Sequence, residues 1–272
     1  MLVAHTPDAD DAFMFYAMLN GKIQTKLKIE HLIEDIETLN RMAFEGKLDV
    51  TALSVHAYAY LDNKYRILSA GASVGEGYGP IVVAKDSIDL SEAKIAIPGK
   101  YTTANLLLKL VLGDFKAVEM RFDEIIPAVK RGDVDAGLLI HEGQITYEMH
   151  GLRKILDLWE FWQDATGLPL PLGVNVINRN IPEEEQREFL RVMKESIRYA
   201  LENVDEALEH AMRYSRGLSG DLVRKFALMY VNEYTLEMPP KVVKAIETLY
   251  DMAEEKGILK KPKMDILFLE EP

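Results

Sequence analysis

Two periods of hydrophobic residues alternate along the first half of the chain, one typical of strands and one typical of helices. Short apolar or alternating runs predict strands at residues 2–4, 26–33, 50–53, 65–68 and 80–84. Apolar residues spaced three or four apart predict helices at residues 10–18 and 35–45. Gly21 and Gly46 follow these two stretches, and glycine commonly ends a helix.

The alternation starts again near residue 95 and gives way to helices after residue 178. We predict strands at residues 95–97, 117–120, 136–140 and 173–178, and helices at residues 102–112 and 123–131. Pro182 and the three glutamates after it have the composition of a helix start, because acidic side chains favour the N-terminal end of the helix dipole. Further helices are predicted near residues 219–231 and 239–256.

Two stretches of the later sequence resemble two stretches of the earlier sequence in order and spacing. Residues 3–16 align with 95–108 as strand, loop and helix start. Residues 46–55 align with 132–141 as helix stop, glycine, aspartate and strand. A chance likeness between two βα units is the alternative explanation. We interpret the pattern as a duplication that produces two similar α/β lobes.

Two such lobes define the expected fold class. Ligands of open α/β sheets bind beyond the carboxyl ends of the strands, so we expect a ligand cleft between the lobes. The prediction is an α/β, two-lobed, type II periplasmic-binding-protein-like fold. The first lobe is expected to be discontinuous, with residues 1–84 and 174–272, and the second, inserted lobe to comprise residues 85–173.

Composition narrows the possible partners. The chain has 32 Lys and Arg against 44 Asp and Glu, a net charge of −12, so nucleic-acid backbones and anionic membrane surfaces would repel it. The absence of cysteine excludes disulfides and thiol nucleophiles. The sequence shows neither a signal peptide nor an apolar run of the ~20 residues that span a bilayer. We expect a cytoplasmic protein with no nucleic-acid or membrane partner; a trimmed secreted protein is the alternative.

Polar residues at predicted strand ends and helix starts are the candidates for chemistry. Residues 102–104 open a helix whose free N–H groups suit a carboxylate or phosphate, and capping by Thr102 is the alternative. Ser54 ends a strand and is expected either to donate to the same ligand or to cap the next helix. Asp10 is interpreted mainly as a helix cap, and Asp11 as a cap that also holds ligand hydroxyls. A metal site formed by His5, Asp8 and Asp10 is a weaker alternative.

His141 directly follows the apolar run AGLLI, one step beyond a predicted strand. At such a position side chains point toward a ligand, and an imidazole with an ordinary pKa of ~6.5 accepts a proton at neutral pH. Glu142 either orients this imidazole or begins the next turn, and a purely structural histidine is the alternative. Trp159 and Trp162 are expected in the core or on the cleft wall, or over a flat ligand ring.

Several of these segments together resemble the 1,4-dihydroxy-6-naphthoate synthases of the futalosine route to menaquinone. The likeness covers nearly the whole chain and lies in PDADDAFMFYA (7–17), EDIETLNRMAFEGKLDVTALS (34–54), PGKYTTA (98–104), LLIHEGQITY (138–147) and TGLPLPLG (166–173). The resemblance implies a lyase without a cofactor that converts cyclic dehypoxanthinyl futalosine, a small-molecule carboxylate, to 1,4-dihydroxy-6-naphthoate and dihydroxyacetone. Where some members have a loop with proline and asparagine, this chain has Asp8-Ala9-Asp10, although Asp11 still matches.

The resemblance also implies roles for individual residues. His141 matches the family's catalytic histidine and would act as general base. The segments that match the family's substrate-binding residues are Ala52, Leu53 and Ser54, Thr102, Thr103 and Ala104, together with Asp11. Two other functions compete with this interpretation. One is chorismate dehydratase, of the same pathway and fold, and the other is a non-catalytic solute-binding protein for a small carboxylate.

Overall fold

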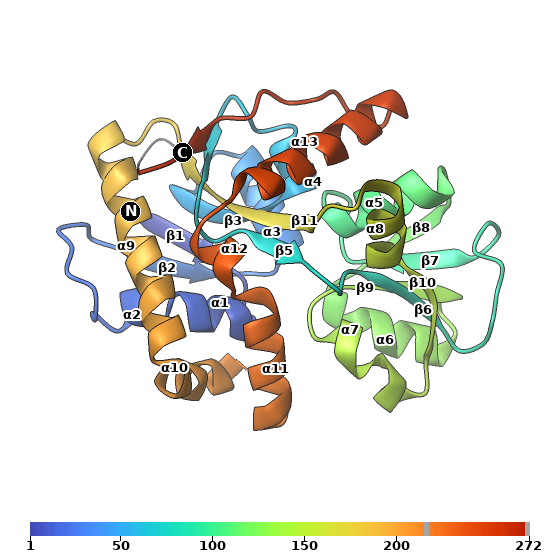
Figure 1. Cartoon of the computed structure of the whole chain (residues 1–272). Helices are drawn as coiled ribbons and strands as arrows, with labels where there is room; N and C mark the ends of the chain where they lie inside the picture. Colours follow the sequence, from blue (N-terminus) through green and yellow to red (C-terminus); the bar gives the residue numbers. More distant parts are fainter. Residues whose placement is uncertain (215–217, 270–272) are drawn as a thin grey trace. The chain divides into compact units, whose positions relative to one another are not determined.

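The strands of the computed structural model, which describes residues 1–214 and 218–269, form two separate sheets (Figure 1). Each sheet belongs to its own compact unit. The first unit comprises residues 1–74, 173–243 and those described from 262 onward, and the second unit comprises residues 75–172 and 244–261. Each unit is therefore assembled from discontinuous stretches of the chain.

These divisions differ from the expected lobe boundaries at two places. Residues 75–84 were expected in the first lobe but belong to the second unit, and residues 81–84 hydrogen-bond to strands of the second sheet. Residues 244–261 were also expected in the first lobe and belong to the second unit. Lys256 illustrates the reason, because its Nζ donates to the carbonyl oxygen of Leu110 at 2.6 Å.

The first sheet has the strand order β12-β4-β11-β3-β1-β2, with β5 paired to β11. Its strands are β1 (Leu2–His5), β2 (Glu30–Ile33), β3 (Val50–Ser54), β4 (Tyr65–Leu68), β5 (Ser73–Gly75), β11 (Leu170–Asn178) and β12 (Ile266–Leu267). β1 runs parallel to β2 and β3, whereas β11 runs antiparallel to β3 and β4. The strand predicted over 26–33 is shorter than expected, because its pairing with β1 begins at Glu30.

Helices of the first unit pack on this sheet and on one another. They are α1 (Ala9–Met14), α2 (Tyr16–Leu19), α3 (Ile36–Phe44), α4 (Val55–Tyr58), α9 (Glu183–Glu202), α10 (Val204–Ala211), α11 (Gly220–Tyr230) and α12 (Glu233–Leu236), and α13 (Pro240–Glu255) extends into the second unit. The single helix predicted over 10–18 is divided at Phe15 into α1 and α2. α3 begins where the Asp35 side chain accepts two main-chain N–H bonds, and it packs on β3.

The second sheet has the order β10-β6-β9-β7-β8. Its strands are β6 (Ile81–Ala84), β7 (Lys94–Ile97), β8 (Lys116–Glu119), β9 (Ala136–Leu139) and β10 (Arg153–Asp157). Figure 1 shows α6 (Phe122–Arg131) and α7 (Gly143–Thr146) on the opposite side of this sheet from α5 (Thr103–Leu112) and α8 (Leu158–Thr166). Gly137 lets α6 approach β9 closely, since a Cβ there would lie 2.4 Å from Cγ2 of Ile125.

The two sheets repeat one arrangement. In each, a central strand is parallel to both neighbours (β1 with β2 and β3, β7 with β8 and β9), and an antiparallel strand follows (β11 beside β3, β6 beside β9). The repeat extends to one side chain, because Asp49 accepts the N–H of Leu2 at 2.8 Å and Asp135 accepts that of Lys94 at 2.7 Å. The predicted duplication is confirmed at the level of topology.

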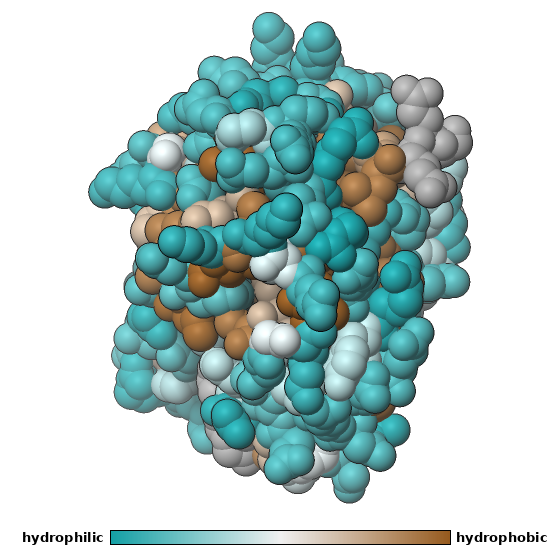
Figure 2. Space-filling model, turned by 90° about the vertical axis from the view of Figure 1, so that its left-hand side faces the viewer, coloured by the Kyte–Doolittle hydropathy of each residue, from teal (hydrophilic) through white to brown (hydrophobic). Residues whose placement is uncertain are grey.

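One face of the molecule is mainly hydrophilic. Figure 2 shows the side on which α9 and α2 lie in Figure 1, and this side is mainly hydrophilic, with hydrophobic side chains near its middle. Among the residues that the structure describes, no helix combines the length and the apolar character needed to cross a bilayer.

Candidate active site

One edge of the second sheet collects two of the predicted segments. β7 and β9 are parallel neighbours, with Ile95 beside Ala136, so their carboxyl ends lie at the same edge. The chain leaves β7 toward Thr102 and the start of α5, and it leaves β9 toward His141. The structure therefore places His141 and the N-terminus of α5 at one edge, where open α/β sheets bind ligands.

His141 has an unusual backbone conformation. Its φ is 54°, and it is the one non-glycine residue in the described part of the chain with a positive φ. This left-handed conformation is costly for most side chains, and such strain is concentrated at functional sites. The imidazole is half-buried and meets the ring of Phe122 edge-on, with 4.9 Å between the ring centres. The residue as a whole is less buried than His5 of the first unit, although its Nε2 atom is itself buried.

The two threonine hydroxyls at the start of α5 both donate to main-chain carbonyls. Thr102 donates to Gly99 at 2.9 Å and accepts the N–H of Asn105 at 3.3 Å, so the predicted capping role is confirmed. Thr103 donates to the carbonyl of Leu172 at 2.6 Å. A carbonyl oxygen only accepts, so each hydroxyl hydrogen is already used. An anion held here would rest on the N–H groups of the first turn, which include that of buried Ala104.

The corresponding edge of the first sheet collects the other predicted segments. β1 and β3 are parallel neighbours, with Val3 beside Val50. β1 leads to the turn before α1, and β3 ends at Ser54. Ala52, Leu53 and Ser54 are all buried, and Ser54 is the last residue of β3.

Asp11 links this turn to the helix that follows. One carboxylate oxygen, Oδ2, accepts the N–H of Thr6 at 2.6 Å and its hydroxyl at 2.8 Å. Burial raises the pKa of Asp11, although nearby His5 and the bonds from Thr6 act in the opposite direction. The interpretation of Asp10 as a cap was wrong: Asp8 occupies the N-cap position, and its side chain makes no capping hydrogen bond.

Ser54 is held by a buried amide that the sequence did not reveal. Asn40 of α3, which has no exposed surface, accepts the N–H of Ser54 with Oδ1 at 3.0 Å and donates from Nδ2 to its Oγ at 3.1 Å. Ser54 occupies the N-cap position of α4, but its side chain makes no capping bond. The alternative interpretation of Ser54 as a helix cap is therefore correct in position, but its side chain does not cap the helix.

Three histidines of the first unit form a group that sequence reasoning missed. His5 has no exposed surface; its Nδ1 lies 2.9 Å from the Thr6 carbonyl, and its ring stacks on Phe15 at 4.8 Å. The ring of His31 meets that of His5 edge-on at 5.5 Å, and burial lowers the pKa of His31 to about 4. Burial also lowers the pKa of His210, on α10. The three residues come from distant stretches, and no spacing pattern connects them.

The remaining predicted candidates are structural or unsupported. Trp162 is fully buried and donates from Nε1 to the carbonyls of Leu168 and Pro169, at 2.8 and 3.0 Å, so it belongs to the core. Within residues 1–214 and 218–269, no three histidine, aspartate or glutamate side chains are arranged to hold a metal ion. The weaker hypothesis of a metal site built on His5 finds no support in this arrangement.

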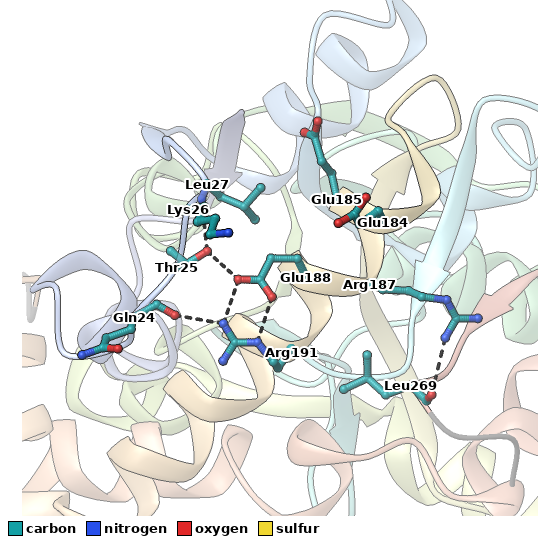
Figure 3. A pocket seen from close by; sticks show the side chains of 10 residues that line it. All are labelled: Gln24, Thr25, Lys26, Leu27, Glu184, Glu185, Arg187, Glu188, Arg191 and Leu269. Carbon is teal, nitrogen blue, oxygen red and sulfur yellow. Dashed lines mark hydrogen bonds and ion pairs between the residues drawn. The ribbon is translucent and has the colours of Figure 1, made fainter.

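A groove of about 810 Å³ in the first unit contains none of the predicted site residues. Figure 3 shows that it lies between residues 24–27 and α9, with Leu269 at its rim. Glu188 accepts from Thr25 at 2.8 Å and from Arg191 at 2.7 and 2.8 Å, and Arg191 holds the pKa of Glu188 at about 2. The charges of Glu188 and Arg191 therefore satisfy each other.

Comparisons with known proteins give one consistent result. A family model described as "Menaquinone biosynthesis" matches residues 1–255. A Thermus thermophilus protein is 38% identical over 254 residues, 93% of either chain, and a Streptomyces coelicolor protein is 31% identical over 264 residues, 94% of either chain. Both relatives are named 1,4-dihydroxy-6-naphthoate synthase.

Solved structures agree with the fold. A crystal structure of an Archaeoglobus fulgidus protein, 64% identical, superposes with a TM-score of 0.93 over 95% of this chain and 98% of that one. A Candida albicans protein described as having the periplasmic binding protein fold superposes with a TM-score of 0.67 at 15% identity, over 97% of this chain and 92% of that one. The predicted periplasmic-binding-protein-like fold class is confirmed.

Proposed function

Because the chain belongs to the 1,4-dihydroxy-6-naphthoate synthase family of menaquinone biosynthesis, we propose that it is a lyase acting on cyclic dehypoxanthinyl futalosine. The products in this proposal are 1,4-dihydroxy-6-naphthoate and dihydroxyacetone. The names of the two relatives support a synthase of this naphthoate. The proposed setting is the cytoplasm, where the family's pathway operates.

His141 is the general base of the proposed reaction. It takes a proton from the substrate, a carbon–carbon bond breaks, dihydroxyacetone leaves, and the remaining ring becomes aromatic. The observation that carries this role is the left-handed backbone of a half-buried histidine at the carboxyl end of β9. A strained position is kept where its side chain is needed in one orientation.

The substrate-binding roles follow the hydrogen-bonding capacity of each segment. The N–H groups at Thr103 and Ala104 suit the substrate carboxylate, because a helix N-terminus carries partial positive charge. Asp11 suits substrate hydroxyls, since its Oδ1 has no donor among the described residues. Ser54, at the end of β3, adds a hydroxyl from the first sheet.

The test is turnover of cyclic dehypoxanthinyl futalosine by the purified chain, followed by chromatographic detection of the naphthoate. We expect His141→Ala to lower kcat by about 10²–10⁴-fold, the usual contribution of general acid–base catalysis. His150→Ala is the matched control, because His150 is an exposed histidine of the same unit.

Other results would select other functions. Full turnover by His141→Ala would refute the base role. Naphthoate binding without turnover by the unmodified chain would favour a solute-binding protein. Consumption of chorismate, offered in a parallel assay, would favour the dehydratase of the same pathway.

A further inference from the structure

The contact between Asn40 and Ser54 fixes the direction of each of its two hydrogen bonds. A main-chain N–H only donates, so the Asn40 atom that faces the N–H of Ser54 at 3.0 Å must be the oxygen. The other end of the amide is therefore the NH2 group, which only donates, and it lies 3.1 Å from Ser54 Oγ. Ser54 Oγ thus accepts from Asn40 and keeps its own hydrogen.

That hydrogen has no acceptor within the part of the chain that the structure describes. Ser54 makes no other side-chain hydrogen bond there, and only 4% of its surface is exposed. A buried O–H without an acceptor is costly, so the position suits a group that arrives from outside. The hydroxyls of Thr102 and Thr103 in the second unit differ, because both already donate to carbonyls.

The Asn40 amide is itself held in place on α3. The carboxylate of Glu37, one turn earlier and also buried, lies 3.4 Å from Nδ2 of Asn40. The other Glu37 oxygen pairs with Nη2 of Arg41 at 3.1 Å. The NH2 group is thus contacted by Ser54 Oγ and Glu37, and rotating the amide would place its oxygen against the carboxylate.

We propose that Asn40 is a positioning residue that directs the Ser54 hydroxyl hydrogen toward an acceptor oxygen of the substrate. The acceptor is of the carbonyl or carboxylate class, since the hydroxyl is left with a donor to offer. This inference rests on the proposed function, because it assumes that Ser54 contacts the substrate. Asn40 touches no substrate atom in this arrangement and acts only through Ser54.

Reversal of the hydrogen-bond direction gives the sharpest test. In Asn40→Asp, made together with Glu37→Gln so that the new carboxylate does not face the Glu37 carboxylate, the side chain keeps its size and still accepts the Ser54 N–H, but its second oxygen accepts the Ser54 hydroxyl and withdraws that donor; Glu37→Gln alone is the reference. We expect KM for cyclic dehypoxanthinyl futalosine to rise about 3- to 10-fold with kcat nearly unchanged, the value of one hydrogen bond. Ser54→Ala should raise KM equally, and the double variant should raise it no further.

Controls separate this role from a general loss of stability. Asn178→Asp introduces the same change at another buried asparagine of the first sheet, away from Ser54, and thermal unfolding of every variant is measured first. Asn40→Ala provides a second cycle with Ser54→Ala if the aspartate variant does not fold. Independent, multiplicative effects of Asn40 and Ser54 variants on KM, or an unchanged KM in both Asn40 variants, would overturn the proposal.

A failure of the proposed function would look different. If the unmodified chain does not turn over the substrate, the same cycle is measured as dissociation constants for 1,4-dihydroxy-6-naphthoate by calorimetric titration. Non-additive weakening would then support the positioning of Ser54 while the lyase assignment fails. Equal affinity of all variants would reject the positioning role.

Discussion

Five strands of the first sheet have the same order and directions as the five strands of the second sheet, but the loops at their corresponding strand ends differ in hydrogen bonding. Asp11 and Thr103 are equivalent in the duplication that aligns residues 3–16 with 95–108. Asp11 accepts two hydrogen bonds from Thr6, whereas Thr103 donates its hydrogen to Leu172. The duplicated fold therefore fixes where a side chain lies, and the local partners decide what it offers a ligand.

The same contrast separates the histidines. In the second unit, His141 is half-buried at a strand end and has a strained backbone. In the first unit, His5 is wholly buried behind the turn at the end of β1, against Phe15 and His31. The histidine at the edge of the second sheet is thus partly accessible, whereas His5 at the edge of the first sheet is enclosed.

The largest difference in activity between the two edges is expected when the equivalent residues Asp11 and Thr103 are each replaced by a side chain that cannot form hydrogen bonds. Asp11→Ala removes the acceptor for Thr6 and, in the proposed function, the acceptor for substrate hydroxyls. We expect kcat/KM to fall about 10- to 100-fold, as for a hydrogen bond to a charged group. Thr103→Val keeps the main-chain N–H groups of α5, so its loss should be only about 3-fold. Steady-state kinetics measure both.

Equal losses in these two variants would contradict the difference drawn between the edges. They would mean that the Thr103 hydroxyl contacts the substrate in spite of its bond to Leu172. Thermal unfolding of both variants provides the control, because each change also removes an internal hydrogen bond.

The sequence predicted most central elements because they carry a clear hydrophobic period. β3 and β9 are buried along their whole length, and β7 is buried after Lys94, so each contains a short, mainly apolar run. β10 was missed, because it is an edge strand that begins with exposed Arg153 and Lys154. β5 and β12 were missed because strands of three and two residues are too short to show a period.

Site chemistry was predictable only where it depends on position along the chain. The placement of His141 just beyond a strand was visible, and so was the capping role of Thr102. The partner of Ser54 was not, because Asn40 lies 14 residues away on another element. The grouping of His5 with His31 was hidden for the same reason, since sequence spacing carries no sign of contacts between elements.

The two sheets can also be compared in stability, through the equivalent aspartates that directly precede β3 and β9. Asp49 accepts the N–H of Leu2 in a partly buried bond, and Asp135 accepts that of Lys94 in an exposed one. We expect Asp49→Ala to lower the free energy of unfolding by about 1–2 kcal/mol, and Asp135→Ala by about 0.5 kcal/mol. Urea unfolding measures the difference, with the exposed neighbour variant Asp133→Ala as control. A larger loss at Asp135 would reverse the ranking based on burial.

The smallest effect concerns stability in acid. We expect the first unit to lose stability in acid because it contains the buried histidines. Burial lowers the pKa of His31 to about 4, so the folded protein holds this imidazole neutral where the unfolded chain, with an ordinary pKa near 6.5, already binds a proton. The unfolded state therefore binds more protons between these values, and stability falls as pH decreases from about 6.5 to 4. His31→Leu should flatten this part of the stability curve, whereas exposed His150→Leu should leave it parallel to that of the unmodified chain. Urea unfolding between pH 4 and 7 measures the free energy of unfolding of each variant. Amide hydrogen exchange shows whether the loss of stability lies in the first unit. A curve for His31→Leu as steep as that of the unmodified chain would show that other groups, such as His210 or carboxylates, control acid stability instead.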